Sequence, residues 1–516
     1  MRALQQRHLI NSFASAKFEK FFYQVDKIDV KVGKRVKPYP REFKCSKLIY
    51  SYPDPNKPGK FRIKMPPPCE SGCTWCNRED MWDSRKTAFH IPVVDNAALF
   101  DKRYFLKHAA EFVSTMPKHV ETMSYKTVID CYDGAKKRRY KTAREEMRDG
   151  ERLRAWSAVQ MFVKPDRYDA GNVWDKAPRA IQFRHPCFNL KMAKFLKPFE
   201  HAYYSMVDWT GYRVVAKGQN NLQRAENIVE CSKMFDNPVY VLMDHKKFDA
   251  HVLVEHLRFL HRIYDRCFRD KRLTKLLQYQ IHNRCFSKGG IRYKVEGTRM
   301  SGDYDTGLGN TLLNHYMIFN VLHGLKYHLL LDGDDSVVIM EKRDLGRIHK
   351  DSFLRMGMET TIEVVTELHQ VEFCRAKLLV LDPPRFARDP IRALSNMTVS
   401  FKSYPAAGAL QYIAGLGVGE AAASNGVPII GPIAWKMSQA HSKPILDENI
   451  KYMYGAAGDP LLIDDDAREL FYEQYGISPQ IQRVMEKSYV TPRGVCYKLQ
   501  SQVYNSRPLS RADIFL

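Results

Sequence analysis

The chain has 516 residues, of which 44% are hydrophobic and 12% aromatic, so it has material for several packed subdomains, and the composition excludes an intrinsically disordered chain. The 81 Lys and Arg residues outnumber the 58 Asp and Glu residues, which gives a formal net charge of +23 and indicates a polyanionic partner. Nucleic acid is the leading candidate and an anionic membrane surface the second, and net charge alone does not separate them.

The first 100 residues are punctuated by proline, as in YPDPNKPGK and MPPPCESGC, which predicts loops rather than long helices. The opening MRALQQRHLI lacks the apolar core of a signal peptide. No charge-free apolar run has spanning length, and the nearest, 406–435, carries Glu420 and several glycines. We therefore expect a soluble chain without a transmembrane segment of its own, in a reducing compartment, because its 11 scattered cysteines do not resemble a disulfide framework.

Three of these cysteines, Cys69, Cys73 and Cys76, have the spacing of the iron–sulfur loop of radical S-adenosylmethionine enzymes. Such enzymes require repeated strand–helix units, which the next hundred residues do not show. A structural zinc completed by Cys45 or His90 is the stronger alternative, and unliganded loop cysteines are the favoured interpretation.

A basic run, KKRRYKTAR at 136–144, predicts a solvated helix face or a phosphate contact. Further along, VYVLM at 239–243 is a short apolar run bounded by Pro238, which predicts a buried strand that ends at Asp244. Apolar residues at helical spacing predict a helix over 306–322.

Two apolar runs, YHLLL and SVVIM, flank the sequence DGDD. The pattern predicts a β-hairpin with a Gly-centred turn that presents Asp334 and Asp335 at its tip. One Gly-Asp-Asp is more often a polar turn than a site. Here, however, Asp244-x4-Asp249 after a strand, SGDYDTGLGN before a helix and GDD between two strands follow in order, and chance is a poor explanation for all three.

Carboxylates that converge in this way suit nucleotidyl transfer, in which paired divalent cations stabilise charge on the attacking and leaving oxygens. Asp244 and Asp334 are the predicted bridging ligands, with Asp335 beside them. Mg²⁺ prefers such hard oxygen ligands, and we expect two Mg²⁺ or Mn²⁺ ions at this site.

These motifs resemble those of the RNA-dependent RNA polymerases of positive-strand RNA viruses, most closely the tombusvirus-like (Tombusviridae) group. Asp-x4-Asp, SGxxxTxxxN and GDD stand intact, and VEFCRAKLL at 371–379 is similar to the family's next motif, which supports the primer strand. By this resemblance the nucleotide-binding residues of the palm are Asp249, Ser301, Gly302, Thr306 and Asn310.

Upstream, MFVKPDRYDAGNVWDKAPRAIQFR at 161–184 resembles the fingers motif that covers the incoming triphosphate. The resemblance makes Lys164, Lys176, Arg179 and Arg184 candidates for phosphate contact, with a surface basic loop as the alternative. HPCFNLKMAKFLKPFEHAYY and KGQN (217–220) also look like the family, so the similarity extends from about residue 162 to 379.

Polar groups at the ribose can select for the 2′-hydroxyl, and Asp249 and Asn310 suit that task. Reverse transcriptases typically carry a bulky aromatic at the position of Asp249, so an aspartate favours ribonucleotides. The alternative is that both residues merely cap or brace the palm.

The family usually places a lysine after the GDD hairpin as proton donor to pyrophosphate, and METTIEVVTELHQ offers none. His369, or Lys350 further upstream, are the remaining candidates, and the role stays open.

The expected fold is α+β, a closed right hand of fingers, palm and thumb, in which helices flank an antiparallel palm sheet. The predicted boundaries are an N-terminal extension at 1–100, fingers at 101–237, palm at 238–262, a fingers insertion at 263–297, palm again at 298–384 and thumb at 385–516.

The resemblance implies replication of a viral RNA genome, with RNA template and product and nucleoside triphosphates as partners, in the host cytoplasm or at membrane-associated replication complexes. It leaves open whether a membrane-anchored viral replication protein takes part. A reverse-transcriptase-like enzyme and a non-catalytic basic RNA-binding viral protein are the alternatives.

Overall fold

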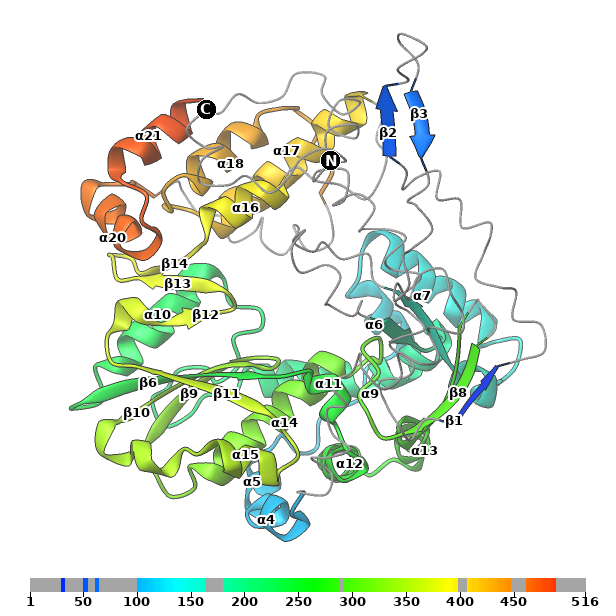
Figure 1. Ribbon diagram of the computed structural model, residues 1–516. Helices are drawn as coiled ribbons and strands as arrows, with labels where there is room; N and C mark the ends of the chain where they lie inside the picture. The colour runs from blue at the N-terminus through cyan, green and yellow to red at the C-terminus, as the bar shows by residue number, and fades with distance from the viewer. Residues whose placement is uncertain are drawn as a thin grey trace. The chain divides into compact units, whose positions relative to one another are not determined.

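The computed structural model describes residues 29–32, 50–53, 61–64, 100–163, 180–287, 291–397, 406–446 and 461–488. The chain forms two compact units, each assembled from segments that are distant in sequence (Figure 1). Unit 1 comprises Met1–Tyr203, His245–His323 and His349–Thr360. Unit 2 comprises Tyr204–Asp244, Gly324–Ile348 and Thr361–Leu516.

Unit 1 contains a five-stranded sheet in the order β1-β8-β7-β4-β5. Its strands are β1 (Asp29–Val32), β4 (Val159–Val163), β5 (Ala180–Phe183), β7 (His282–Ser287) and β8 (Ile291–Glu296). The β4–β7 pairing is parallel, and the other pairings of this sheet are antiparallel. The segment predicted to return to the fingers therefore shares a sheet with residues from the predicted first fingers segment.

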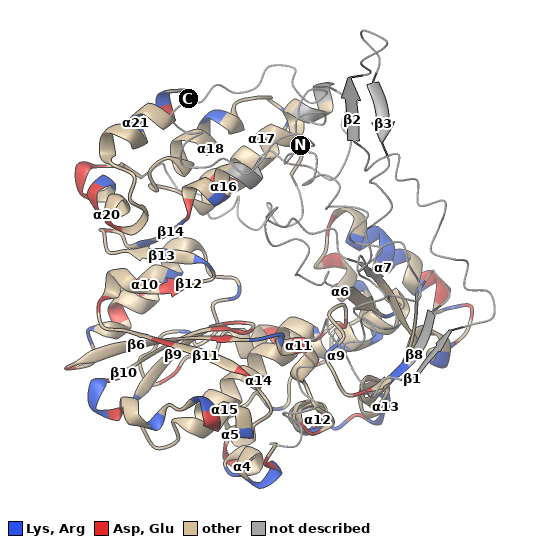
Figure 2. Ribbon diagram, in the orientation of Figure 1, with Lys and Arg blue, Asp and Glu red and all other residues tan. Residues whose placement is uncertain are grey.

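Helices supply the rest of the described part of unit 1, together with the short antiparallel pair β2 (Tyr50–Pro53) and β3 (Phe61–Lys64). These helices are α4 (Lys102–Leu106), α5 (Ala109–Thr115), α6 (Tyr125–Asp130), α7 (Gly134–Glu146), α8 (Leu153–Trp156), α9 (Pro186–Tyr204), α11 (Phe248–His251), α12 (Val254–Phe268), α13 (Lys271–Ile281), α14 (Thr306–Val321) and α15 (Lys350–Arg355). The basic run predicted to be helical lies in α7, which carries Lys and Arg along its length (Figure 2).

An aromatic cluster holds four helices of unit 1 together. The rings of Phe105 (α4), Phe112 (α5) and Phe259 (α12) surround Tyr316 of α14, and the Phe259 and Tyr316 centroids lie 4.2 Å apart. All four side chains are at most 2% exposed, and each buried aromatic ring of this kind contributes about 2–3 kcal/mol of transfer free energy. This cluster fixes the axis of α14, whose first residues follow SGDYD.

Unit 2 is built on a four-stranded sheet in the order β11-β6-β10-β9. Its strands are β6 (Pro238–His245), β9 (Tyr327–Asp332), β10 (Asp335–Glu341) and β11 (Thr360–Val365), and β10 pairs antiparallel with both β6 and β9. The predicted strand at 239–243, the predicted hairpin and the predicted helix over 306–322 are thus confirmed, with small shifts of their ends.

One face of this sheet packs on α10 (Asn221–Ser232). Tyr240, Leu330, Val337 and Ile339 form a buried cluster with Ile228 of that helix. A capping box between the side chains and backbones of Asn220 and Gln223 starts α10 and satisfies donors that would otherwise lack partners.

The remaining described part of unit 2 is a small sheet followed by helices. Strands β12 (Glu372–Phe373), β13 (Ala376–Leu379) and β14 (Arg385–Arg388) precede α16 (Pro390–Met397), α17 (Ala406–Ala423), α18 (Ile430–Ser438), α20 (Asp465–Tyr475) and α21 (Pro479–Ser488), and the 3-10 turns are η3 (Lys342–Arg347) and η4 (Leu368–Gln370). The helical prediction for ALQYIAGLGV and ELFYEQYGI is confirmed. Among the helices that the structure describes, none is long and apolar enough to cross a bilayer.

Candidate active site

The three predicted metal ligands lie at one end of the unit 2 sheet. Pairing of Ser336 with Met243 is the last printed step of the β6–β10 ladder, so Asp335 and Asp244 occupy the next matching positions. Residues opposite each other in an antiparallel pair point to the same face, with their Cα atoms about 5 Å apart. Asp334 stands in the turn between β9 and β10, where Gly333 has a φ of 75° that favours glycine.

Burial and mutual repulsion raise the proton affinity of this cluster. Burial, followed by the charges of Asp334 and Asp244, raises the pKa of Asp335 to about 6. Burial also raises the pKa of Asp334, and the charge of Asp244 adds to the effect. The pKa shifts indicate concentrated negative charge, which a divalent cation would neutralise.

Next to this cluster lies an ion pair network whose members were absent from the predicted site. Asp332 lies opposite Asp335 in the sheet and accepts from Lys217 at 2.5 Å and from Arg224 at 2.7 Å. Burial opposes the charge of Asp332, but the two cations outweigh it and lower its pKa. Burial and the neighbouring carboxylates raise the pKa of the Cys374 thiol to about 12.

The sequence contained partial signals for these residues. Lys217 opens KGQN and Cys374 lies in VEFCRAKLL, and both stretches resemble the family, while Asp332 precedes GDD directly. No sequence pattern, however, indicated that Lys217 and Asp332, which are 115 residues apart, form an ion pair.

The palm aspartates are not among the described groups of three residues whose ligand atoms all lie within 4.8 Å of one another. Those groups are His108–Glu111–His323 and Glu146–His185–Cys187, both in unit 1. Without a cation between them, like-charged carboxylates repel, and joint ligation requires the aspartate side chains to turn inward.

The two residues predicted to inspect the ribose, Asp249 and Asn310, are brought together in unit 1. Asn310 Nδ2 donates to Asp249 Oδ1 at 2.7 Å, and this bond orients the amide. Asp249 follows the first residue of α11, and Asn310 lies on the first turns of α14. The buried Asn310 Oδ1 has no hydrogen-bond partner within the described ranges. Ribose recognition by the pair remains a prediction.

Ser301, Gly302 and Thr306 hold the loop before α14 against β5. The Gln182 N–H donates to Ser301 Oγ at 3.2 Å, and the Gly302 N–H donates to the Gln182 carbonyl at 2.6 Å. A Cβ at Gly302 would stand 2.5 Å from the Cβ of Phe183, so close approach of the two segments requires glycine. Thr306 Oγ1 donates to the Met300 carbonyl at 2.7 Å and closes the loop. These contacts brace the loop, and nucleotide contact by the three residues stays a prediction.

Arg184, predicted to contact the triphosphate, is 1% exposed. Its Nε donates to Asp303 Oδ1 at 2.7 Å, and its terminal nitrogens donate to Asn283 Oδ1 and to the Ser157 carbonyl. In this arrangement the guanidinium braces the SGDYD loop from within, and phosphate contact would require it to leave these partners. The sequence analysis did not assign Asp303 any role.

A second buried ion pair supports the same loop. Arg299 Nη1 lies 3.0 Å from Asp305 Oδ2, and Gln280 Nε2 donates to Asp305 Oδ1 at 2.7 Å and to Asp303 Oδ2 at 3.3 Å. Gln280 therefore links the two ion pairs into one network, and Asp305 directly precedes the first residue of α14.

Several predicted residues lie outside the described ranges. These are Lys164, Lys176, Arg179, Cys45, Cys69, Cys73, Cys76 and His90. The two candidate proton donors are described: Lys350 is exposed at the start of α15 in unit 1, and the half-buried His369 lies in η4 of unit 2. Neither placement assigns the proton transfer.

Comparison with known proteins identifies the family. Residues 92–493 match the family described as viral RNA dependent RNA polymerase, a wider span than the motifs had indicated. The chain is 30% identical to the RNA-directed RNA polymerases of groundnut rosette virus (384 residues; 69% of this chain, 45% of the relative), oat chlorotic stunt virus (411 residues; 71% and 54%) and carnation mottle virus (387 residues; 70% and 50%).

The chain thus spans about half the length of the curated relatives it matches. Carnation mottle virus is a member of the Tombusviridae, which agrees with the group to which the motifs pointed. The match covers both units and every motif singled out above. This chain belongs to the family of viral RNA-dependent RNA polymerases.

Proposed function

We propose that the chain is an RNA-directed RNA polymerase that replicates a viral RNA genome by nucleotidyl transfer from nucleoside triphosphates. The observation that carries the proposal is the meeting of Asp244, Asp334 and Asp335 at one end of the unit 2 sheet, with the pKa values of Asp334 and Asp335 raised. Three acidic groups kept together against their repulsion are costly unless a bound cation offsets the charge.

The donor set fits two Mg²⁺ or Mn²⁺ ions, because it offers several carboxylate oxygens and leaves room for phosphate oxygens and water as further ligands. Asp244, Asp334 and Asp335 would hold these ions. When bound, they stabilise charge on the attacking 3′-oxygen and on the leaving pyrophosphate. Lys217 and Arg224, through Asp332, hold the end of β9 and so position the turn that carries Asp334.

We propose that Asp249 and Asn310 recognise the ribose. Their direct bond fixes the amide and leaves polar groups that a 2′-hydroxyl can engage as donor and acceptor. Lys164, Lys176 and Arg179 are the proposed triphosphate contacts, together with Arg184 if it exchanges its buried partners. His369 and Lys350 remain the candidates for proton transfer to pyrophosphate.

The family and the mixed helix and sheet content support a closed hand of fingers, palm and thumb. In this proposal the antiparallel sheet that carries the aspartates is the palm, and the C-terminal helices α16 to α21 form the thumb. The enzyme would work in the host cytoplasm or at membrane-associated replication complexes, with a membrane-anchored viral protein as a further proposed partner.

Primer extension on an RNA template tests the proposal. Wild-type protein with Mg²⁺ or Mn²⁺ should extend the primer, and Asp334→Asn should lower the rate by at least about a thousandfold, because it removes a ligand from the charge-stabilising centre. The exposed Asp351 on α15 supplies the matched control, and Asp351→Asn should extend normally. Equal extension by wild type and Asp334→Asn would leave only an RNA-binding protein.

Deoxynucleoside triphosphates separate this proposal from reverse transcription. We expect strong preference for ribonucleotides, and we expect Asp249→Ala to reduce that preference more than it reduces the rate with ribonucleotides. Preferential incorporation of deoxynucleotides by the wild-type chain would contradict the assignment to RNA synthesis.

A further inference from the structure

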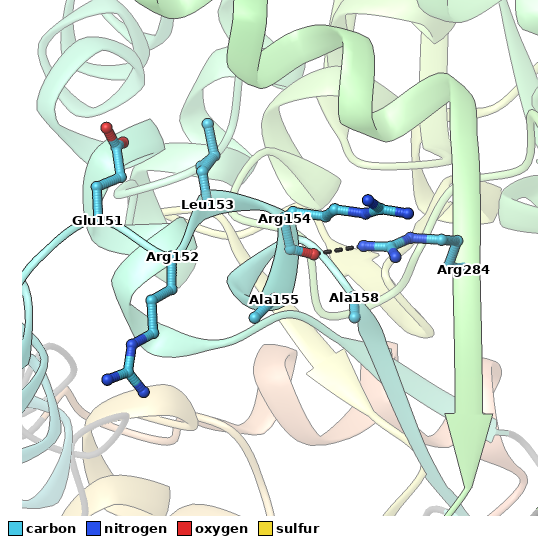
Figure 3. A pocket seen from close by; sticks show the side chains of 7 residues that line it. All are labelled: Glu151, Arg152, Leu153, Arg154, Ala155, Ala158 and Arg284. Atoms are coloured by element: carbon cyan, nitrogen blue, oxygen red, sulfur yellow. Dashed lines mark hydrogen bonds between the residues drawn. The ribbon is translucent and has the colours of Figure 1, made fainter.

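Two adjoining hollows on unit 1 are lined mainly by cationic side chains. The larger, of about 530 Å³, is lined by Arg152, Arg154 and Arg284 beside Leu153, Ala155 and Ala158 (Figure 3). The smaller hollow has a volume of about 170 Å³. Glu151 and Leu153 line both hollows, which therefore form one continuous groove, and Glu151 is the one carboxylate among the described lining residues.

Two guanidinium groups meet in the larger hollow. Arg154 of α8 and Arg284 of β7 extend side by side, and Arg284 Nη2 donates to the Arg154 backbone carbonyl, while Glu151 and Arg152 point away from the pair (Figure 3). Both arginines are exposed, and no described carboxylate forms a salt bridge with either of them. Two like charges held together repel, and an anion between them would relieve that repulsion. The planar forks suit phosphate oxygens.

The smaller hollow combines further cations with aromatic rings. Lys194 Nζ lies 5.7 Å from the centre of the Tyr125 ring, and Phe195 lines the same hollow. Lys275 also lines it, and neither Lys194 nor Lys275 has a salt-bridge partner in the described part of the chain. Of the other two cations, Lys191 pairs with Glu151 at 2.9 Å, and Arg272 pairs with Asp270 at 2.5 Å.

We propose that this groove binds the backbone of single-stranded RNA, with Arg154 and Arg284 clamping one phosphate and Lys194 and Lys275 contacting the next part of the strand. A cationic groove with an aromatic side chain is the arrangement by which proteins hold single strands regardless of sequence. The concave shape and arginine forks favour a strand over a membrane surface, which would contact a convex or flat face through apolar side chains. The identification of the ligand as RNA rests on the proposed function.

The experiment measures binding of a fluorescent single-stranded oligouridylate to the full chain in EDTA, so a protein without polymerase activity still yields a result. The test variant is Arg154→Gln with Arg284→Gln. The matched control is Arg103→Gln with Arg258→Gln, which removes the same charge from exposed positions of unit 1 outside the groove. Thermal melting of each variant verifies folding, and Arg154→Lys tests the fork at constant charge.

We expect the test variant to bind about tenfold more weakly and to lower the slope of log affinity against log salt by about 1.4, since each lost phosphate contact on a single strand accounts for about 0.7. The control should change neither by more than about twofold. Equal losses in both variants, or no loss in the test variant, would refute a specific groove. Loss of binding to phosphatidylcholine–phosphatidylserine vesicles with RNA binding intact would refute RNA as the ligand.

Discussion

Asp335 illustrates how one carboxyl group balances stability against function. Its folded-state pKa is raised to about 6, mainly by burial and then by Asp334 and Asp244. The folded protein therefore binds this proton more tightly than the unfolded chain does. Ionisation of Asp335 costs stability as the pH rises from about 4 to about 6, and the cost is fully present at neutral pH.

Replacing the charge should therefore stabilise the metal-free protein at neutral pH. We expect Asp335→Asn to raise the free energy of unfolding by on the order of 1 kcal/mol near pH 7.5, after allowance for solvent screening of this partly exposed side chain, and to give no gain near pH 4. Denaturant unfolding in EDTA at both pH values measures the effect. An equal gain at both values would show that the charge is not its source.

Gly302 makes a second residue-scale prediction. Gly302→Ala places a Cβ 2.5 Å from Phe183 Cβ and 2.8 Å from the Gln182 carbonyl oxygen, so β5 and the loop must separate. We expect a loss of about 1–3 kcal/mol in unfolding free energy and a strong loss of extension activity, measured by denaturant unfolding and primer extension. Gly346→Ala, where a Cβ meets nothing within 4 Å, is the control and should lose neither.

At the scale of elements, the Arg184–Asp303 pair couples β5 to the loop that leads into α14. Arg184→Lys keeps the charge but cannot reach Asp303, Asn283 and the Ser157 carbonyl together. We expect a loss of about 2–4 kcal/mol in unfolding free energy, because buried polar partners are left unpaired.

The same variant distinguishes bracing from phosphate contact. A bracing arginine affects stability and turnover together, whereas a phosphate ligand chiefly raises the KM for nucleoside triphosphate and leaves the free energy of unfolding unchanged. Steady-state kinetics beside denaturant unfolding separate the two roles. An unchanged stability with a raised KM would restore the triphosphate contact predicted from the sequence.

At the scale of the whole molecule, binding of a cation to the folded state should raise the melting temperature, because a ligand that binds only the native form stabilises it. We expect Mn²⁺ to raise the melting temperature of the wild type by a few degrees and that of Asp334→Asn by much less. Asp351→Asn should retain the full shift. An equal shift in all three proteins would place the cation elsewhere.

Much of the architecture could be predicted from local patterns. The strand before Asp244, the hairpin around DGDD and the helix from Thr306 were all readable, because apolar periodicity and turn chemistry act over a few residues. The C-terminal helices were readable for the same reason. The order of strands in the two larger sheets was not, because the same strands admit several pairings.

By itself, the sequence determined the family, the identity of the acidic residues and the elements that carry them. The tertiary structure alone decided their partners: Arg184 with Asp303 across 119 residues, Lys217 with Asp332 across 115, and Asn310 with Asp249 across 61. The physical reason is that hydrophobic periodicity is written in neighbouring residues, whereas an ion pair forms wherever packing leaves two charges within reach and shielded from water.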